Sequence, residues 1–178
     1  MSGYCAYVAT ITDDNDVDKI YHDKHYGVRI EDDDELFGRL LMEINQAGLS
    51  WRTILKKEYG FRVAYHNFSI AKVARYKEKD IARLLSDEGI IRNRLKVNAA
   101  IYNANQILQL QKEYTSFSSW LDIQAKELQH NKEKWVILFK KHFKFVGGEI
   151  VGEFLMSISL LPHAHHKNCK VYRQKKNR

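Results

Sequence analysis

Residues 41–51 of the chain read LMEINQAGLSW, and this stretch predicts the end of one helix, a tight turn and the start of another. Apolar side chains at positions 37, 41 and 44 recur at spacings of four and three, the pattern of a helix with one buried face. Glycine is frequent just beyond a helix C-terminus, and serine just before a helix N-terminus. Gly48 therefore predicts the end of the first helix, and Ser50 predicts the cap of a second helix that begins near Trp51.

Glu43 places a carboxylate in the middle of this otherwise apolar stretch. A buried carboxylate is costly unless it has a partner or accepts hydrogen bonds from a ligand. Two interpretations are therefore open. Glu43 lies on the solvated face of its helix, which is the commoner case for a lone glutamate, or it is buried and binds a ligand.

Helical periodicity continues outward from this segment and predicts an all-α fold, because no run of residues shows sustained strand alternation. A chain of 178 residues with one proline and nine glycines favours one domain, residues 1–178, made of two packed helical lobes. The polar, basic segment 173–178 is expected to fray. Further helices are predicted at residues 69–76, 78–85, 92–113, 118–127, 132–142 and 148–160.

The sequence shows no membrane or secretion signal. Its N-terminus lacks a basic segment followed by an apolar run, and no stretch approaches the roughly 20 apolar residues of a spanning helix. We therefore expect a cytoplasmic protein with no membrane partner.

Charge is distributed unevenly along the chain. Residues 1–50 carry a net charge of −7, and the remainder carries a net charge of +14. Such asymmetry is typical of a protein that meets a polyanion with one side only. An ordinary basic protein with a pI near 9.3 is the alternative, so charge alone does not establish nucleic-acid binding.

Cys5 and Cys169 are the only cysteines, and they lie near opposite ends of the chain. Three interpretations are open: the two cysteines are unrelated buried thiols, they form a disulfide, or they bind a metal. A cytosolic setting disfavours the disulfide. His165 lies four residues before Cys169, and together with Cys5 and His22 these residues form a Cys2His2 set suited to one structural Zn²⁺. His163 and its neighbour His166 are rival ligands in the same tract.

Several further motifs occur in a fixed order along the chain. They are Tyr21-His22-Asp23, Gly27, the DEGIIRNRLK run at 87–96, the FKFVG run at 143–147 and the terminal segment from His165 to Cys169. Together with QAGLSW at 46–51 and Cys5, these motifs resemble the type I 3-methyladenine DNA glycosylase family. The resemblance extends from Cys5 to about Tyr172.

The resemblance implies an all-α helix-hairpin-helix DNA glycosylase fold, with a structural zinc that joins the terminal segments 1–30 and 161–172. It implies that Glu43 is the base-recognition and catalytic residue and that aromatic side chains bind the base. It also implies a DNA-contacting turn, in which Leu49 fills the gap left by the extruded nucleotide, and a hairpin that binds phosphate. The base-binding aromatics would be Trp51, Tyr21 and Tyr7, and the DNA-binding residues Gln46, Gly48, Leu49, Gly89, Arg92 and Arg94.

The activity implied by the resemblance is hydrolysis of the N-glycosidic bond of 3-methyladenine in alkylated double-stranded DNA. The base would be flipped into a pocket and released free, leaving an abasic site. We expect Glu43 mainly to orient the base while water attacks the sugar, with a general-base role less favoured. No obvious pocket lysine supports a lyase reaction. The expected enzyme is a monofunctional monomer, associated with the nucleoid if bacterial.

Two other functions remain open: a non-catalytic, zinc-stabilised module that binds damaged DNA, and a zinc-stapled helical interaction protein with no DNA role. The chain also departs from the family pattern. Tyr7 stands where the family usually has tryptophan, and the family's H-D-x-E-W-G becomes His22 to Gly27, with Tyr26 in place of the tryptophan. Asp18 occupies a position where relatives can carry tyrosine, and Glu153 one where a small polar residue is also found. These departures put the selectivity of the pocket in doubt.

Overall fold

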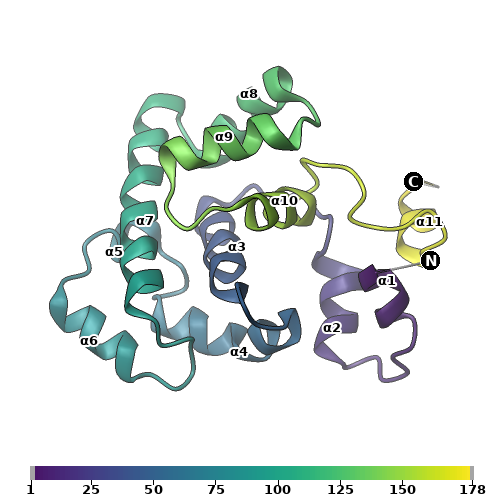
Figure 1. Cartoon of the computed structure of the whole chain (residues 1–178), viewed down its shortest axis with the longest axis horizontal. Coiled ribbons are helices and arrows are strands. Elements are labelled where there is room, and N and C mark those ends of the chain that lie inside the picture. The colour runs from purple at the N-terminus through teal and green to yellow at the C-terminus, as the bar shows by residue number, and fades with distance from the viewer. Residues whose placement is uncertain (1–2, 177–178) are drawn as a thin grey trace.

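A computed structural model describes residues 3–176 of the chain, and every regular element in this part is helical. The all-α prediction is confirmed (Figure 1). Residues 177 and 178 of the basic tail lie outside the described residues. The elements are α1 (Gly3–Val8), α2 (Val17–Ile20), the π-helix η1 (Tyr21–His25), α3 (Asp33–Gln46), α4 (Trp51–Ala64), α5 (Ile70–Val73), α6 (Glu78–Ser86), α7 (Arg94–Tyr114), α8 (Phe117–Leu128), α9 (Lys132–His142), α10 (Gly148–Ser157) and α11 (Lys170–Lys176).

Several helix boundaries differ from the sequence-based expectation. The helix expected at 148–160 ends at Ser157, as α10. The helix expected at 69–76 is only the short α5, because the chain continues in i to i+3 turns before α6. The helix expected from Arg92 begins at Arg94, because the side chain of Asn93 caps it by accepting the backbone N–H of Lys96 at 3.1 Å. The basic tail was expected to fray, but α11 continues through Lys176.

Helix α3 is the centre of the main core. It packs against α4, α7, α8 and α10, and ten of its fourteen residues are buried. Gly38 permits one of these contacts, because a Cβ at this position would lie 2.3 Å from the ring of Phe68. The core is rich in aromatic side chains, including Phe37, Phe61, Phe117, Trp120 and Trp135.

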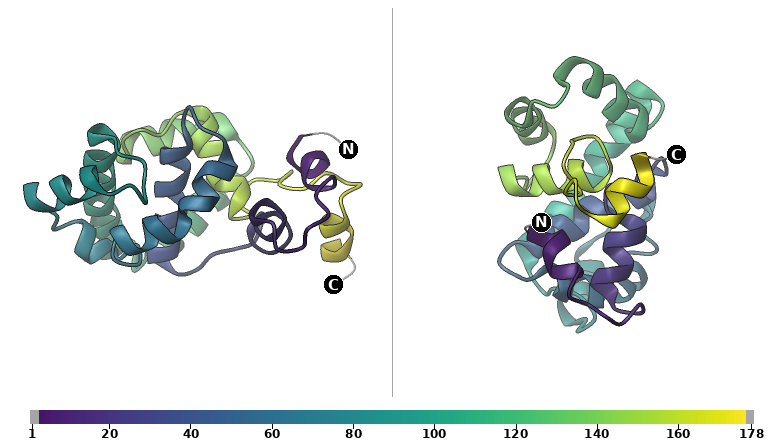
Figure 2. Two further views of the ribbon diagram at one scale, coloured as in Figure 1. Left: turned by 90° about the horizontal axis from the view of Figure 1, so that it is seen from below. Right: turned by 90° about the vertical axis from the view of Figure 1, so that its right-hand side faces the viewer.

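The two ends of the chain form a separate group beside this core. Figures 1 and 2 show α1, α2 and α11 together at one end of the molecule, away from α5 and α6. Arg52, near the start of α4, ties α2 to the main body by ion pairs to Asp16 at 2.7 Å and Asp18 at 2.6 Å. Within residues 3–176, the helices are all too short or too polar to span a membrane.

Candidate active site

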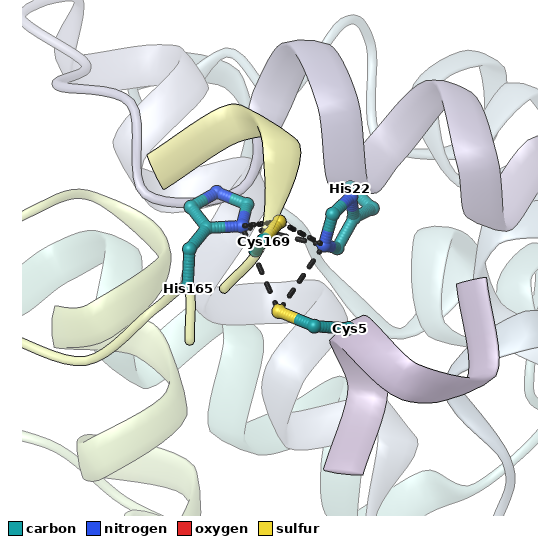
Figure 3. A group of neighbouring side chains, drawn as sticks. All are labelled: Cys5, His22, His165 and Cys169. Carbon is teal, nitrogen blue, oxygen red and sulfur yellow. Dashed lines mark hydrogen bonds between the residues drawn. The ribbon is translucent and has the colours of Figure 1, made fainter. Parts of the chain in front are cut away.

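Four side chains from the two ends of the chain converge on one point. Cys5 comes from α1, His22 from η1, His165 from the loop after α10, and Cys169 from the residue before α11 (Figure 3). All four are buried, and their ligand atoms lie within 4.8 Å of one another. Both cysteines are free thiols, so the disulfide alternative is wrong.

The spacing of these atoms fits a tetrahedral metal ion. Nε2 of His22 lies 3.3 Å from Sγ of Cys5 and 3.7 Å from Sγ of Cys169, and Nδ1 of His165 lies 3.8 to 3.9 Å from the same sulfurs. Bonds of about 2.0 Å to nitrogen and 2.3 Å to sulfur place tetrahedral ligand atoms roughly 3.3 to 3.8 Å apart. The group can therefore hold a metal with four protein ligands.

The second ring nitrogen of each histidine is also engaged. Nδ1 of His22 lies 2.7 Å from a carboxylate oxygen of Asp23, and Nε2 of His165 lies 2.9 Å from the carbonyl oxygen of Tyr26. Such partners fix the ring orientation and tautomer of metal-ligating histidines. Of the three histidines in the C-terminal tract, His165 belongs to the group, whereas His166 meets it through its backbone. The N–H of His166 donates to Cys5 at 3.4 Å, and its carbonyl accepts the N–H of Cys169 at 2.7 Å.

A cavity of about 1070 Å³ lies beside the metal group, between the chain ends and helices α3, α4 and α10. Cys5 and His165 line it, so the metal group forms part of its wall. Its other lining residues include Tyr4, Tyr21, Tyr26, Glu43, Gln46, Trp51, Glu153 and Met156. The structure thus gathers residues from both chain ends and from the 41–51 segment around one space.

Glu43 is buried in the wall of this cavity, with only 4% of its surface exposed. The solvated-face interpretation is therefore wrong. Burial raises the pKa of Glu43 to about 8, with Arg39 lowering it and Glu153 raising it further. In the described part of the chain, no group donates a hydrogen bond to the Glu43 carboxylate, which leaves it as an acceptor for whatever enters the cavity.

Aromatic rings surround this carboxylate. Tyr21 contacts Trp51 with ring centroids 5.1 Å apart and Tyr26 at 5.7 Å. Arg39 donates to the Tyr21 hydroxyl at 3.1 Å and lies over its ring, which fixes the ring in place. Nε1 of Trp51 is buried without a hydrogen-bond partner in the described residues. The cavity thus combines flat apolar faces with unpaired polar groups, a combination suited to a planar ligand.

The turn between α3 and α4 is held from within. The Gln46 side chain donates to the carbonyl of Leu49 at 2.8 Å, and the Leu49 N–H donates to the Gln46 carbonyl at 2.7 Å. Gly48 has φ +83°, a conformation that favours glycine. The Leu49 side chain is consequently 38% exposed at the surface. It lies next to Gln46, which lines the cavity.

Comparisons with known proteins identify the family of the chain. A family model described as methyladenine glycosylase matches residues 11–173. The chain belongs to the methyladenine glycosylase family. The chain is 35% identical to DNA-3-methyladenine glycosylase 1 of Escherichia coli (strain K12), covering 85% of this chain and 89% of that one. It is 32% identical to DNA-3-methyladenine glycosylase of Haemophilus influenzae, covering 84% and 90%.

Solved structures of the family share the fold. The 3-methyladenine DNA glycosylase I (TAG) structure from Staphylococcus aureus has a TM-score of 0.82 and 31% identity, covering 95% of this chain and 96% of that one. A tyrosine-to-phenylalanine variant of 3-methyladenine DNA glycosylase I in complex with 3-methyladenine has a TM-score of 0.82 and 29% identity, covering 96% and 98%.

In this family member, the hairpin between α6 and α7 lies apart from the cavity lining. The N–H of Gly89 donates to the carboxylate of Asp87 at 2.7 Å, so this amide is engaged within the loop. The next three N–H groups, at residues 90 to 92, have no acceptor among the described residues. Arg92 and Arg94 are about half exposed, with only long ion pairs to glutamates at 3.8 and 3.5 Å. Both guanidinium groups can therefore reach an external anion.

One aromatic residue expected at the base lies elsewhere. Tyr7 is 46% exposed, stacks on Tyr4 and does not line the cavity of this glycosylase-family chain. Tyr4 lines the cavity instead, and the sequence did not predict this role for it. Arg39 was also missed, although a charged residue one helical turn before Glu43 was a signal that could have found it.

Proposed function

We propose that this member of the methyladenine glycosylase family is a DNA-repair enzyme. It hydrolyses the N-glycosidic bond of 3-methyladenine in alkylated DNA, releases the free base and leaves an abasic site. One observation carries the proposal: the Glu43 carboxylate, buried and without a protein donor in the described residues, faces a cavity walled by Trp51 and Tyr21. The family membership and the named relatives support the same activity.

The mechanism begins with extrusion of the damaged nucleotide, because a base inside a duplex cannot reach the cavity. Trp51 and Tyr21 stack on the extruded base, and Glu43 accepts a hydrogen bond from its exocyclic amine. A 3-methylated adenine in DNA is cationic, so aromatic faces and a carboxylate favour it. The base becomes neutral on leaving, so tight binding of the cation alone would slow the reaction. Glu43 therefore serves chiefly to select and orient the base while water attacks the sugar.

Contacts with the DNA backbone and stack come from two other segments. Leu49 fills the space left by the extruded nucleotide, on a turn shaped by Gln46 and Gly48, as apolar wedges do in other DNA-binding proteins. The loop around Gly89 binds phosphate through its backbone amides, and Arg92 and Arg94 add charge. The exposure of the Leu49 side chain and of both arginines supports these roles.

The metal in this proposal is one structural Zn²⁺, held by Cys5, His22, His165 and Cys169. Four protein ligands leave no open position, so the ion supplies cross-linking between the chain ends and no chemistry on the base. The chain is then one glycosylase domain of two lobes, with segments 1–30 and 161–172 joined by the metal. It acts as a cytoplasmic monomer.

The test is incubation of the purified, zinc-loaded protein with methylated DNA, followed by identification of the released bases. Wild-type protein is expected to release 3-methyladenine, and Glu43→Gln to release it at least about tenfold more slowly while retaining its fold. No release by folded wild-type protein, combined with retained binding to alkylated DNA, would favour the alternative of a non-catalytic damage-binding module.

A further inference from the structure

The cavity contains a second carboxylate, from a different helix. Glu153 lies on α10, which packs against α3, the helix that carries Glu43. Both glutamates line the same cavity, and the charge of Glu153 raises the pKa of Glu43. The two carboxylates therefore border the same cavity.

The structure brings two departures from the family pattern into contact. Tyr26 stands where the family motif has tryptophan, and its hydroxyl donates to Oε2 of Glu153 at 3.1 Å across 127 positions of sequence. The hydroxyl that holds the carboxylate thus exists only because tyrosine occupies position 26. This pairing gives Glu153 a defined orientation at the cavity wall.

One oxygen of Glu153 remains available to a ligand. Tyr26 engages Oε2, and no described residue donates a hydrogen bond to Oε1. Lys132 on α9, whose charge lowers the pKa of Glu153, forms its ion pair with Glu149 rather than with Glu153. The side chain of Glu153 is accessible, and its surface contributes to the cavity lining.

We propose that Glu153, oriented by Tyr26, is a second base-reading residue, which accepts one N–H of the extruded base while Glu43 accepts another. The inference rests on the proposed function. The exocyclic amine of adenine carries two N–H donors, and a second charged acceptor strengthens binding by pairing the one that Glu43 leaves over. Two carboxylates favour a cationic, amino-bearing purine. Where both are ionised, they disfavour a purine with a carbonyl oxygen in place of the amine, because that oxygen would face two acceptors.

The experiment measures binding of free 3-methyladenine to the full-length zinc-loaded protein, using quenching of tryptophan fluorescence, since Trp51 lines the cavity. In Glu153→Gln, the Tyr26 hydroxyl retains the amide oxygen, so the amide NH₂ is presented to the base in place of an acceptor. We expect the Kd to rise by roughly tenfold or more.

A second variant separates base reading from damage to the fold. Removing the hydroxyl in Tyr26→Phe frees the amide of Glu153→Gln to rotate and present its oxygen. The double variant should then bind 3-methyladenine within about threefold of Tyr26→Phe alone. Glu133→Gln on α9 is the matched control, since Glu133 is exposed and is not among the residues that line the cavity, and it should bind like wild type.

Two results are decisive. Wild-type affinity in Glu153→Gln overturns the inference, and slower excision by the same variant would then place Glu153 at the water or the sugar. A tight-binding wild type with a weakened Glu153→Gln supports it, even if methylated DNA yields no free base. In that last case the proposed glycosylase activity fails while the assignment of Glu153 stands.

Discussion

Gly60 in α4 and Gly89 in the hairpin loop have their backbones in direct contact. A Cβ on Gly60 would lie 2.3 Å from the carbonyl oxygen of Gly89. Because α4 begins at Trp51, this one helix joins the wall of the cavity to the loop assigned to phosphate binding. The contact therefore fixes the position of this loop relative to the cavity, which in the proposed function is the spacing between the base pocket and the phosphate contact.

Gly60→Ala should destabilise the protein despite the better helix propensity of alanine. The propensity gain is about 1 kcal/mol, whereas forcing a methyl group against backbone typically costs about 1 to 3 kcal/mol and here meets a fixed carbonyl. Because the methyl group would meet backbone at 2.3 Å, we expect the upper end of that cost and a net loss of about 2 kcal/mol in chemical denaturation. Gly148→Ala is the control, because the nearest atom to its Cβ is 4.0 Å away. Equal stability of Gly60→Ala and wild type would contradict the close contact.

Cys169→Ser should abolish stoichiometric zinc binding. Elemental analysis is expected to find about one zinc per wild-type chain and almost none in the variant, because three ligands hold a structural ion poorly. Chelation should lower the Tm of wild type and leave the Tm of the metal-free variant unchanged.

His163→Ala serves as the control for the metal assignment. His163 is near the four-residue group in sequence but is not one of its members. Full zinc content in Cys169→Ser, or its loss in His163→Ala alone, would reject the ligand set.

The raised pKa of Glu43 predicts a specific pH dependence of stability. The ordinary pKa of glutamate is near 4.5, and that of folded Glu43 is about 8. Between these values the unfolded chain has lost a proton that the folded protein retains, so stability falls as pH rises through this window. The loss is complete above pH 8 and amounts to at most about 5 kcal/mol.

Glu43→Gln removes this titration. Its stability relative to wild type should therefore increase from about pH 5 to about pH 9, measured by chemical denaturation at each pH. The unpaired buried amide of the variant lowers its free energy of unfolding by the same amount at every pH. The prediction is therefore tested by how the stability difference between the two proteins changes with pH. Parallel stability curves for the two proteins would show that Glu43 is not shifted as described.

Arg92→Ala should weaken DNA binding and flatten its salt dependence. Removing one phosphate contact lowers the slope of log K against log salt by about 1 and affects all sequences alike. Lys126→Ala is the comparison, because Lys126 lies on α8, away from the hairpin (Figure 1). If both variants give the same slope as wild type, Arg92 makes no phosphate contact.

Local patterns were enough to predict most helices and the candidate metal ligands. Helical spacing, the Gly48 turn and the Ser50 cap depend on neighbours in sequence, and cysteine and histidine are chemically distinctive wherever they fall. The burial of Glu43 could not be predicted in this way, because it depends on which face of α3 meets α10 and the chain ends. In the sequence, Tyr26 and Glu153 were each visible only as a departure from the family pattern. Their contact could not be predicted, because it joins residues 127 positions apart.

The position of the metal group has a consequence for the order of folding. Cys5 and Cys169 are 164 positions apart, so closing this contact costs more chain entropy than almost any other in the molecule. We therefore expect the helical core around α3 to form first and the chain ends to join last. Until they join, the wall formed by Tyr4, Cys5 and His165 is missing, and the protein passes through a stage that is largely helical but has no closed pocket for a base.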